Sequence, residues 1–191
     1  MLGRGLMPFS IGNDICQISR IHKIIASKAR HRFVHRILTP EERQQPRAVR
    51  ILECILDQEP EASTAVASKT PSCDNAQHHA QQQTQGSPAL RKAAQYMAGR
   101  FAAKEAVMKA HPRSPRLTWD QIVISTAPAD PIAEHELLQQ GGNPSISTGP
   151  PQALIRGNDV YDDMIAPISI SHDGDYATAV CLGYRQVPKA Q

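Results

Sequence analysis

Residues 89–110 constrain the fold of this chain more than any other segment, because they read as one long helix. At about 100° per residue, alanines share one face, and Met97, Phe101 and Met108 form an apolar stripe beside it. Pro112 ends the helical pattern. Small side chains allow another backbone to approach closely, so we expect a second element to pack directly on the alanine face.

The alanine face also carries two charged residues, Glu105 and Lys109, one helical turn apart. A carboxylate that is partly removed from water usually has a metal or a cation beside it, so Glu105 is a candidate functional residue. The alternative is an exposed Glu105–Lys109 ion pair, which would stabilise the helix by only about 0.2–0.5 kcal/mol. Such pairs are common, and the helix alone favours this alternative.

Three further motifs occur at residues 12–14, 36–42 and 169–172. They read Gly-Asn-Asp, Arg-Ile-Leu-Thr-Pro-Glu-Glu and Ser-Ile-Ser-His, and residues 101–109 read Phe-Ala-Ala-Lys-Glu-Ala-Val-Met-Lys. With these motifs the chain resembles the holo-acyl-carrier-protein synthase type of 4′-phosphopantetheinyl transferase, whose marks include G-x-D, R-I-L-T-P-E-E, F/W-x-x-K-E-A-x-x-K and S-I-S-H in this order. The F/W-x-x-K-E-A-x-x-K motif is specific, whereas G-x-D and S-I-S-H are weak when taken alone. The recognisable segments cover roughly half of the chain.

The resemblance implies an activity and a metal. The activity is transfer of the 4′-phosphopantetheine arm of coenzyme A to a serine of an acyl carrier protein, with release of adenosine 3′,5′-bisphosphate, in support of fatty acid biosynthesis. Negative charge shields the phosphorus that the serine attacks, and a divalent cation would neutralise that charge. The resemblance makes Asp14 and Glu105 the ligands of Mg²⁺, which leaves its other positions to water and phosphate. The local sequence is equally consistent with Asp14 as a helix N-cap, a role worth about 1 kcal/mol.

The same resemblance assigns roles to further residues. Glu105 and Lys109 are implied as catalytic residues, and Arg100, Lys109 and His172 as coenzyme A-binding residues. The Lys109 ammonium either neutralises the pyrophosphate or positions the attacking hydroxyl, and the sequence does not choose between these roles. His172 ends a strand, where a histidine is more often structural, so we assign it to coenzyme A binding and not to general-base chemistry. Lys104 falls in the apolar stripe and is expected to extend its ammonium to solvent.

A basic segment lies between residues 15 and 38 of a chain whose net charge is only +3. It contains no acidic residue, and its arginines and lysines are Arg20, Lys23, Lys28, Arg30, Arg32 and Arg36. Acyl carrier proteins are strongly acidic, and the resemblance places carrier-binding positions at Arg20, Lys28 and Arg30. The alternatives are a solvated basic face and a nucleic-acid contact. Nucleic acid is disfavoured by the lack of interleaved aromatic residues, by the modest net charge and by the absence of a recognisable motif.

The remaining patterns predict the secondary structure around the helix. Residues 9–11 read as a strand that ends at Gly12, after which Asp14 opens a helix with isoleucines on one side. Residues 117–126 read as a strand, and residues 168–182 as a hairpin around an Asp-Gly-Asp turn. We therefore expect an α+β fold, with a small, mainly antiparallel sheet packed around the long central helix. The resemblance implies a homotrimer with coenzyme A bound between subunits.

Two insertions interrupt what we expect to be a single domain over residues 1–191. Residues 59–88 are rich in Gln, Ser and Pro and predict a disordered insertion, because such a tract cannot bury enough apolar surface to offset its ordering entropy. Residues 127–166 are interrupted by Pro and Gly and predict an irregular insertion.

The composition predicts the state of the cysteines and the location of the protein. The four cysteines show no C-x-x-C spacing, which predicts reduced thiols. The absence of a long apolar run predicts no membrane partner. Long polar insertions are typical of eukaryotic chains, which slightly favours a mitochondrial location over a cytoplasmic one. The alternative function is a non-catalytic basic module on the same fold that binds protein or RNA.

Overall fold

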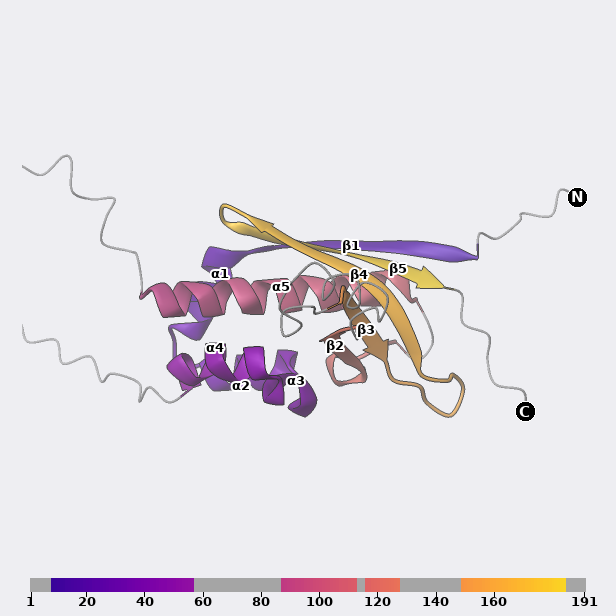
Figure 1. Cartoon of the computed structure of the whole chain (residues 1–191), viewed down its shortest axis with the longest axis horizontal. Coiled ribbons are helices and arrows are strands. Elements are labelled where there is room, and N and C mark those ends of the chain that lie inside the picture. The colour runs from indigo at the N-terminus through magenta and orange to yellow at the C-terminus, as the bar shows by residue number, and fades with distance from the viewer. Residues whose placement is uncertain (1–7, 57–86, 113–115, 128–148, 185–191) are drawn as a thin grey trace, which may run out of the picture.

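The computed structural model describes residues 8–56, 87–112, 116–127 and 149–184. The strands are β1 (Phe9–Gln17), β2 (Ile122–Thr126), β3 (Pro151–Ile155), β4 (Met164–Asp173) and β5 (Tyr176–Tyr184). The helices are α1 (Ile18–Ile25), α2 (Arg30–Ile37), α3 (Pro40–Gln44), α4 (Pro46–Leu56) and α5 (Pro88–Ala110), with the 3₁₀ helix η1 (Trp119–Gln121). In Figure 1, α5 runs between strands β1 and β5 on one side and the layer of α2, α3 and α4 on the other.

The five strands form one antiparallel sheet in the order β1-β5-β4-β3-β2. The predicted α+β fold, a mainly antiparallel sheet around a long helix, is confirmed. The core is made of buried residues from the sheet, from α5 and from α1, α2 and α4. Among the described residues, no helix combines the length and the apolar character needed to cross a membrane.

Helix α5 packs its alanine face directly against the backbones of β1 and β5. Its N-terminus is capped by Ser87, whose side chain accepts a hydrogen bond from the Leu90 amide. Buried alanines follow the face at positions Ala94, Ala98, Ala102, Ala106 and Ala110. A Cβ at Gly12 of β1 would lie 2.6 Å from the Ala110 nitrogen, and one at Gly183 of β5 would collide with the Ala110 carbonyl. The close approach of a second backbone, which the alanines predict, is confirmed.

Strand β1 is longer than the strand that we predicted near the beginning of the chain. We expected a strand over residues 9–11 and a helix that opens at Asp14, but β1 continues through Asp14 to the start of α1. Asp14 pairs with Ala179 of β5. Side chains alternate along β1, so Gly12 and Cys16 are buried while Ile11 and Ile15 face outward. The predicted helix forms as α1, with Ile18, Ile21 and Ile25 buried, but strand pairing delays its start to Ile18. Asp14 is therefore not a helix N-cap.

The predicted insertions are described only in part. The disordered insertion predicted over residues 59–88 lies outside the described residues, except that Ser87 and Pro88 begin α5. Of the irregular insertion predicted over residues 127–166, the described part contains β3 and the start of β4, where the prediction is wrong, whereas residues 156–163 between these strands form no helix or strand. The apolar run of β3 is short and lies between prolines and a glycine, which obscured it in the sequence.

Candidate active site

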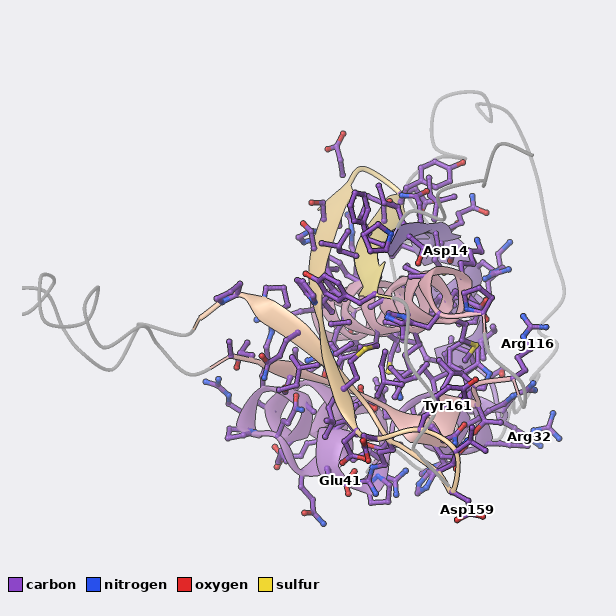
Figure 2. The ribbon with its side chains drawn as sticks, turned by 90° about the vertical axis from the view of Figure 1, so that its right-hand side faces the viewer. Asp14, Arg32, Glu41, Arg116, Asp159 and Tyr161 are labelled. Carbon is purple, nitrogen blue, oxygen red and sulfur yellow. The ribbon has the colours of Figure 1, made fainter. Side chains whose placement is uncertain are left out.

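Strand β1 and helix α5 meet at Asp14 and Lys109. Lys109 Nζ lies 2.7 Å from Asp14 Oδ1 and donates a second hydrogen bond, at 3.0 Å, to the Asn13 carbonyl oxygen. The Asp14 side chain is 15% exposed and that of Lys109 51%. Figure 2 looks along α5 and shows Asp14 beside that helix. The ion pair of Lys109 is therefore made across the strand–helix contact and not along α5 with Glu105.

Glu105 lies one turn before Lys109 on α5, half-buried between Ala102 and Ala106. Residues four apart are neighbours on a helix surface, so Glu105 is one turn from the Asp14–Lys109 pair. Within the described part of the chain, no ion pair or hydrogen bond engages the Glu105 carboxylate. The candidate site thus combines the Asp14 carboxylate of β1 with the Glu105 carboxylate and the Lys109 ammonium of α5, two elements that are far apart in the sequence.

This donor set suits a magnesium ion that shares its coordination with a substrate. Mg²⁺ is typically bound through one or two carboxylates and keeps waters or phosphate oxygens as its other ligands. Among the described residues, no group of three or more His, Cys, Asp or Glu side chains could hold a metal ion alone. Asp14 and Glu105 would therefore leave the other positions of a magnesium ion to water or to a phosphorylated substrate.

A separate cavity of about 380 Å³ lies between α5, α4 and the sheet. Its polar lining consists of Arg47, Lys92, Gln95, Tyr96, Arg100, Ser125, Thr126, Ser171 and His172. The structure thus brings the predicted residues Arg100 and His172 to one cavity. Asp14, Glu105 and Lys109 do not line it. Three permanent cations and a histidine make the cavity suitable for a phosphorylated ligand.

The Arg100 guanidinium is held in place by neighbours. It donates to the Ile124 carbonyl oxygen at 3.0 Å and to Gln45 Oε1 at 3.2 Å, and its central carbon lies 5.0 Å from the centre of the Tyr96 ring. Burial raises the pKa of Tyr96, and the nearby Arg100 opposes that shift. Within the described part of the chain, the buried Tyr96 hydroxyl has no hydrogen-bond partner. An arginine has five N–H donors, so Arg100 keeps donors for a ligand.

Lys92 and Arg47 are cavity residues that the sequence reasoning missed. Lys92 precedes Tyr96 by four residues and Arg100 by eight, so helical spacing from Arg100 could have found it. No local signal marks Arg47, because α4 reaches the cavity only through tertiary packing on α5.

The predicted carrier-binding residues differ in their exposure. Arg20 is exposed on α1, and its guanidinium lies over the Phe101 ring, 5.3 Å from the ring centre. Arg20 Nη2 also lies 3.6 Å from Cys16 Sγ. Lys28 is exposed between α1 and α2. Figure 2 shows the exposed Arg32 of α2 projecting away from the protein.

Arg30 is buried, so the prediction that it binds the carrier protein at an exposed basic surface is wrong. It is 8% exposed, and its Nη1 donates to the Ile55 carbonyl oxygen at 3.1 Å. The last carbonyls of a helix lack partners within that helix, and Ile55 lies in the last turn of α4. Arg30 therefore joins α2 to α4 and is not available at the surface.

Lys104 does not extend its ammonium to solvent, contrary to our expectation, but is buried. Lys104 and Glu42 are both fully buried, with Lys104 Nζ 2.6 Å from Glu42 Oε2 and 3.0 Å from the Trp119 carbonyl oxygen. Burial lowers the pKa of Lys104, and the Glu42 carboxylate opposes that shift. Glu42 also accepts hydrogen bonds from the Thr39 and Ile124 amides. This network ties the Arg-Ile-Leu-Thr-Pro-Glu-Glu segment to α5 beside Glu105.

The Asp14–Lys109 pair joins β1 to α5, Glu105 lies one turn away on α5, and a basic cavity lies elsewhere on the same helix. Residues 10–181 match the family described as the 4′-phosphopantetheinyl transferase superfamily, and the chain belongs to that superfamily.

Two relatives and one solved structure illustrate the similarity. The chain is 29% identical over 177 residues to the mitochondrial 4′-phosphopantetheinyl transferase B of Aspergillus fumigatus, which covers 92% of this chain and 93% of that protein. It is 34% identical over 95 residues to the holo-[acyl-carrier-protein] synthase of Corynebacterium efficiens, covering 47% of this chain and 61% of that protein. An acyl carrier protein synthase structure from Plasmodium yoelii, with ADP bound, aligns over 92% of this chain and 96% of that one at 21% identity, with a TM-score of 0.48.

Proposed function

We propose that this chain is a phosphopantetheinyl transferase of the holo-acyl-carrier-protein synthase type, which modifies a serine of an apo acyl carrier protein in support of fatty acid biosynthesis. The contact of Asp14 with Lys109 carries the proposal, because it joins two of the diagnostic motifs and leaves Glu105 one turn away. The relatives named for phosphopantetheinyl transfer and for holo-acyl-carrier-protein synthesis support the same activity.

In the proposed reaction, the serine oxygen bonds to the phosphorus on the pantetheine side of the coenzyme A pyrophosphate. The bond from that phosphorus to the bridging oxygen breaks, adenosine 3′,5′-bisphosphate leaves with the electron pair, and the serine proton passes to solvent or a base. Asp14 and Glu105 would hold Mg²⁺, which when bound supplies charge neutralisation at the pyrophosphate. Lys109, half-exposed beside Asp14, can turn its ammonium to a phosphate oxygen.

We assign the phosphorylated nucleoside end of coenzyme A to the basic cavity. Lys92, Arg47 and the fixed guanidinium of Arg100 supply positive charge for its phosphates. The buried Tyr96 hydroxyl offers a further hydrogen bond to a ligand. His172 lies at the β4 end of the same cavity, which supports its predicted role in coenzyme A binding.

We also propose that the protein acts as a homotrimer. The cavity and the Asp14 site are lined by different residues, and a second copy could bring one copy's cavity to the other's Asp14 site. The outer face of β1 and β5 exposes apolar side chains, with Ile11 68% and Ile15 62% exposed. An apolar sheet face of this kind suits contact with another copy.

Arg20 and Lys28 remain our candidates for docking the acidic carrier protein. Both are exposed, and Arg20 packs on Phe101 of the motif helix, so a carrier bound at α1 would lie near the Asp14 site. The mitochondrial name of the Aspergillus fumigatus relative supports a carrier in that compartment.

Mass spectrometry tests the function directly. Apo acyl carrier protein incubated with coenzyme A, Mg²⁺ and this protein should gain the mass of one phosphopantetheine arm, and excess EDTA should prevent the gain. Glu105→Gln should abolish transfer. Glu41→Gln is the matched control, because Glu41 is exposed, pairs with Arg156 and lies far from Asp14 in Figure 2. A wild type that binds the carrier without a mass gain would instead be the non-catalytic module.

A further inference from the structure

The turn between β4 and β5 contacts the first turn of α1. Ile18 donates its amide to the Asp175 carbonyl oxygen at 2.8 Å, and Ser19 donates its amide to Asp175 Oδ1 at 2.8 Å. Asp175 Oδ2 accepts from Ser19 Oγ at 2.7 Å and from Gln17 Nε2 at 2.9 Å. The bonds from Ser19 and Gln17 lower the pKa of the Asp175 carboxyl, the Ser19 hydroxyl contributing most.

Helix α1 depends on this distant residue for its N-terminal cap. The residue at its own N-cap position, Gln17, makes no side-chain cap bond, and the first turn contains no acidic residue. The first amides of a helix have no partners within the helix, and a carboxylate at this end also complements the helix dipole. Asp175 therefore replaces the local cap that the sequence of α1 lacks.

The same hairpin end carries a residue of the cavity. His172, three residues before Asp175, lines the cavity together with Arg100. Gly174 has a φ of 54°, which allows the tight turn between the two strands. One turn thus connects the wall of the proposed coenzyme A cavity to the helix that carries Arg20.

We propose that Asp175 is a positioning residue for carrier docking, which holds α1 in the orientation that presents Arg20 and Lys28 to an acidic carrier protein. This inference rests on the function proposed above. Simple electrostatics would give the opposite effect, because a carboxylate beside a basic docking helix repels an acidic partner. The two accounts therefore predict changes of opposite sign when the charge is removed.

The experiment compares Asp175→Ala and Asp175→Asn with Asp173→Asn. The control removes the same charge from the exposed Asp173 of the same hairpin, for which the described structure shows no hydrogen bond or ion pair with α1. The Michaelis constants for apo carrier and for coenzyme A are measured, together with the dissociation constant of a fluorescent apo carrier without turnover. Asp175→Ala should raise the Michaelis constant and the dissociation constant for the carrier about fivefold and leave the coenzyme A constant within about twofold. A fivefold change in affinity corresponds to about 1 kcal/mol, the typical stability lost with a helix cap.

Asp175→Asn should weaken carrier binding, whereas Asp173→Asn should leave it unchanged or tighten it. The inference is overturned if Asp175→Ala binds the carrier as the wild type does, or if the coenzyme A constant rises in parallel. Should Asp175→Ala not fold, Ser19→Ala removes one of the four bonds and should give a smaller rise for the carrier alone; no rise would overturn the inference. Failure of the proposed function is distinguishable, because the wild type itself would then not modify the carrier.

Discussion

Cys181 lies on β5 in the fully buried layer between the sheet and α5, and burial raises the pKa of its thiol to about 12. Burial also raises the pKa of Cys16 on β1, although Arg20 opposes that shift. Because the thiolate is the reactive form, both thiols should be inert wherever the protein stays folded.

We expect iodoacetamide at pH 8.5 to leave Cys16 and Cys181 unmodified in the native protein and to alkylate both in urea, where a thiol has its ordinary pKa of about 8.5. Peptide mass spectrometry reads out each position separately. Native alkylation of Cys181 at the rate found in urea would show that β5 does not pack on α5 as described.

Two elements, β1 and α5, depend on Gly12 for their contact. A Cβ at this position would collide with the Ala106 carbonyl and lie 2.6 Å from the Ala110 nitrogen, both backbone atoms that cannot move aside. We expect Gly12→Ala to lower the free energy of unfolding by at least about 1–3 kcal/mol, the usual cost of overpacking, and to separate Asp14 from Lys109. Urea unfolding measures the change.

Gly99→Ala is the comparison for this prediction. Its Cβ would meet only a side-chain carbon of Ile170, at 3.2 Å, and side chains adjust more easily than backbone. We expect Gly99→Ala to be the milder variant. Equal urea midpoints for Gly12→Ala and the wild type would contradict the close packing of β1 on α5.

The buried pair of Lys104 with Glu42 joins α5 to α3. Lys104→Met would leave the Glu42 carboxylate buried without its cation, a change that typically costs about 3–5 kcal/mol of unfolding free energy. The double variant Lys104→Met/Glu42→Gln removes the charge as well and should recover part of the loss. Fluorescence of Trp119, the only tryptophan of the chain, can follow urea unfolding. A double variant less stable than Lys104→Met would contradict this account.

The sequence predicted the elements whose signals are local, and it could not predict their tertiary partners. The long helix follows from its alanine spacing, and the C-terminal hairpin from its Asp-Gly-Asp turn. The strand conformation of Asp14 depends on pairing with β5, which no nearby residue indicates. Likewise, the sequence indicates that Arg30 and Lys104 are exposed, because it does not show that α4 packs beside Arg30 and Glu42 beside Lys104.

The same limit holds for the candidate site. The motifs identified Asp14, Glu105 and Lys109 through resemblance, and the ion pair of Lys109 with Asp14 emerged only from the packing of β1 on α5. The cavity cations Arg47 and Lys92 belong to no motif, because their role depends on where α4 packs.

At the scale of the whole molecule, the exposed apolar face of β1 and β5 is the feature that a single copy leaves unexplained. Its exposed large apolar side chains are Phe9, Ile11, Ile15, Tyr176, Val180 and Tyr184. We expect analytical ultracentrifugation to find a species of three times the chain mass of 20.9 kDa. Ile11→Glu should produce monomers, because a charge in an apolar interface is costly. Val49→Glu, the same change at an exposed apolar residue of α4, should leave the trimer intact.

A mixing experiment then tests whether two copies share one site. Asp14→Ala and His172→Ala should each transfer poorly alone, since each damages one half of the proposed site. If the Asp14 site of one copy works with the cavity of its neighbour, co-refolded trimers of the two variants should contain some intact sites and regain part of the activity. The mixture should regain nothing when both variants also carry Ile11→Glu. No recovery in mixed trimers that do form would place both halves of the site within one copy.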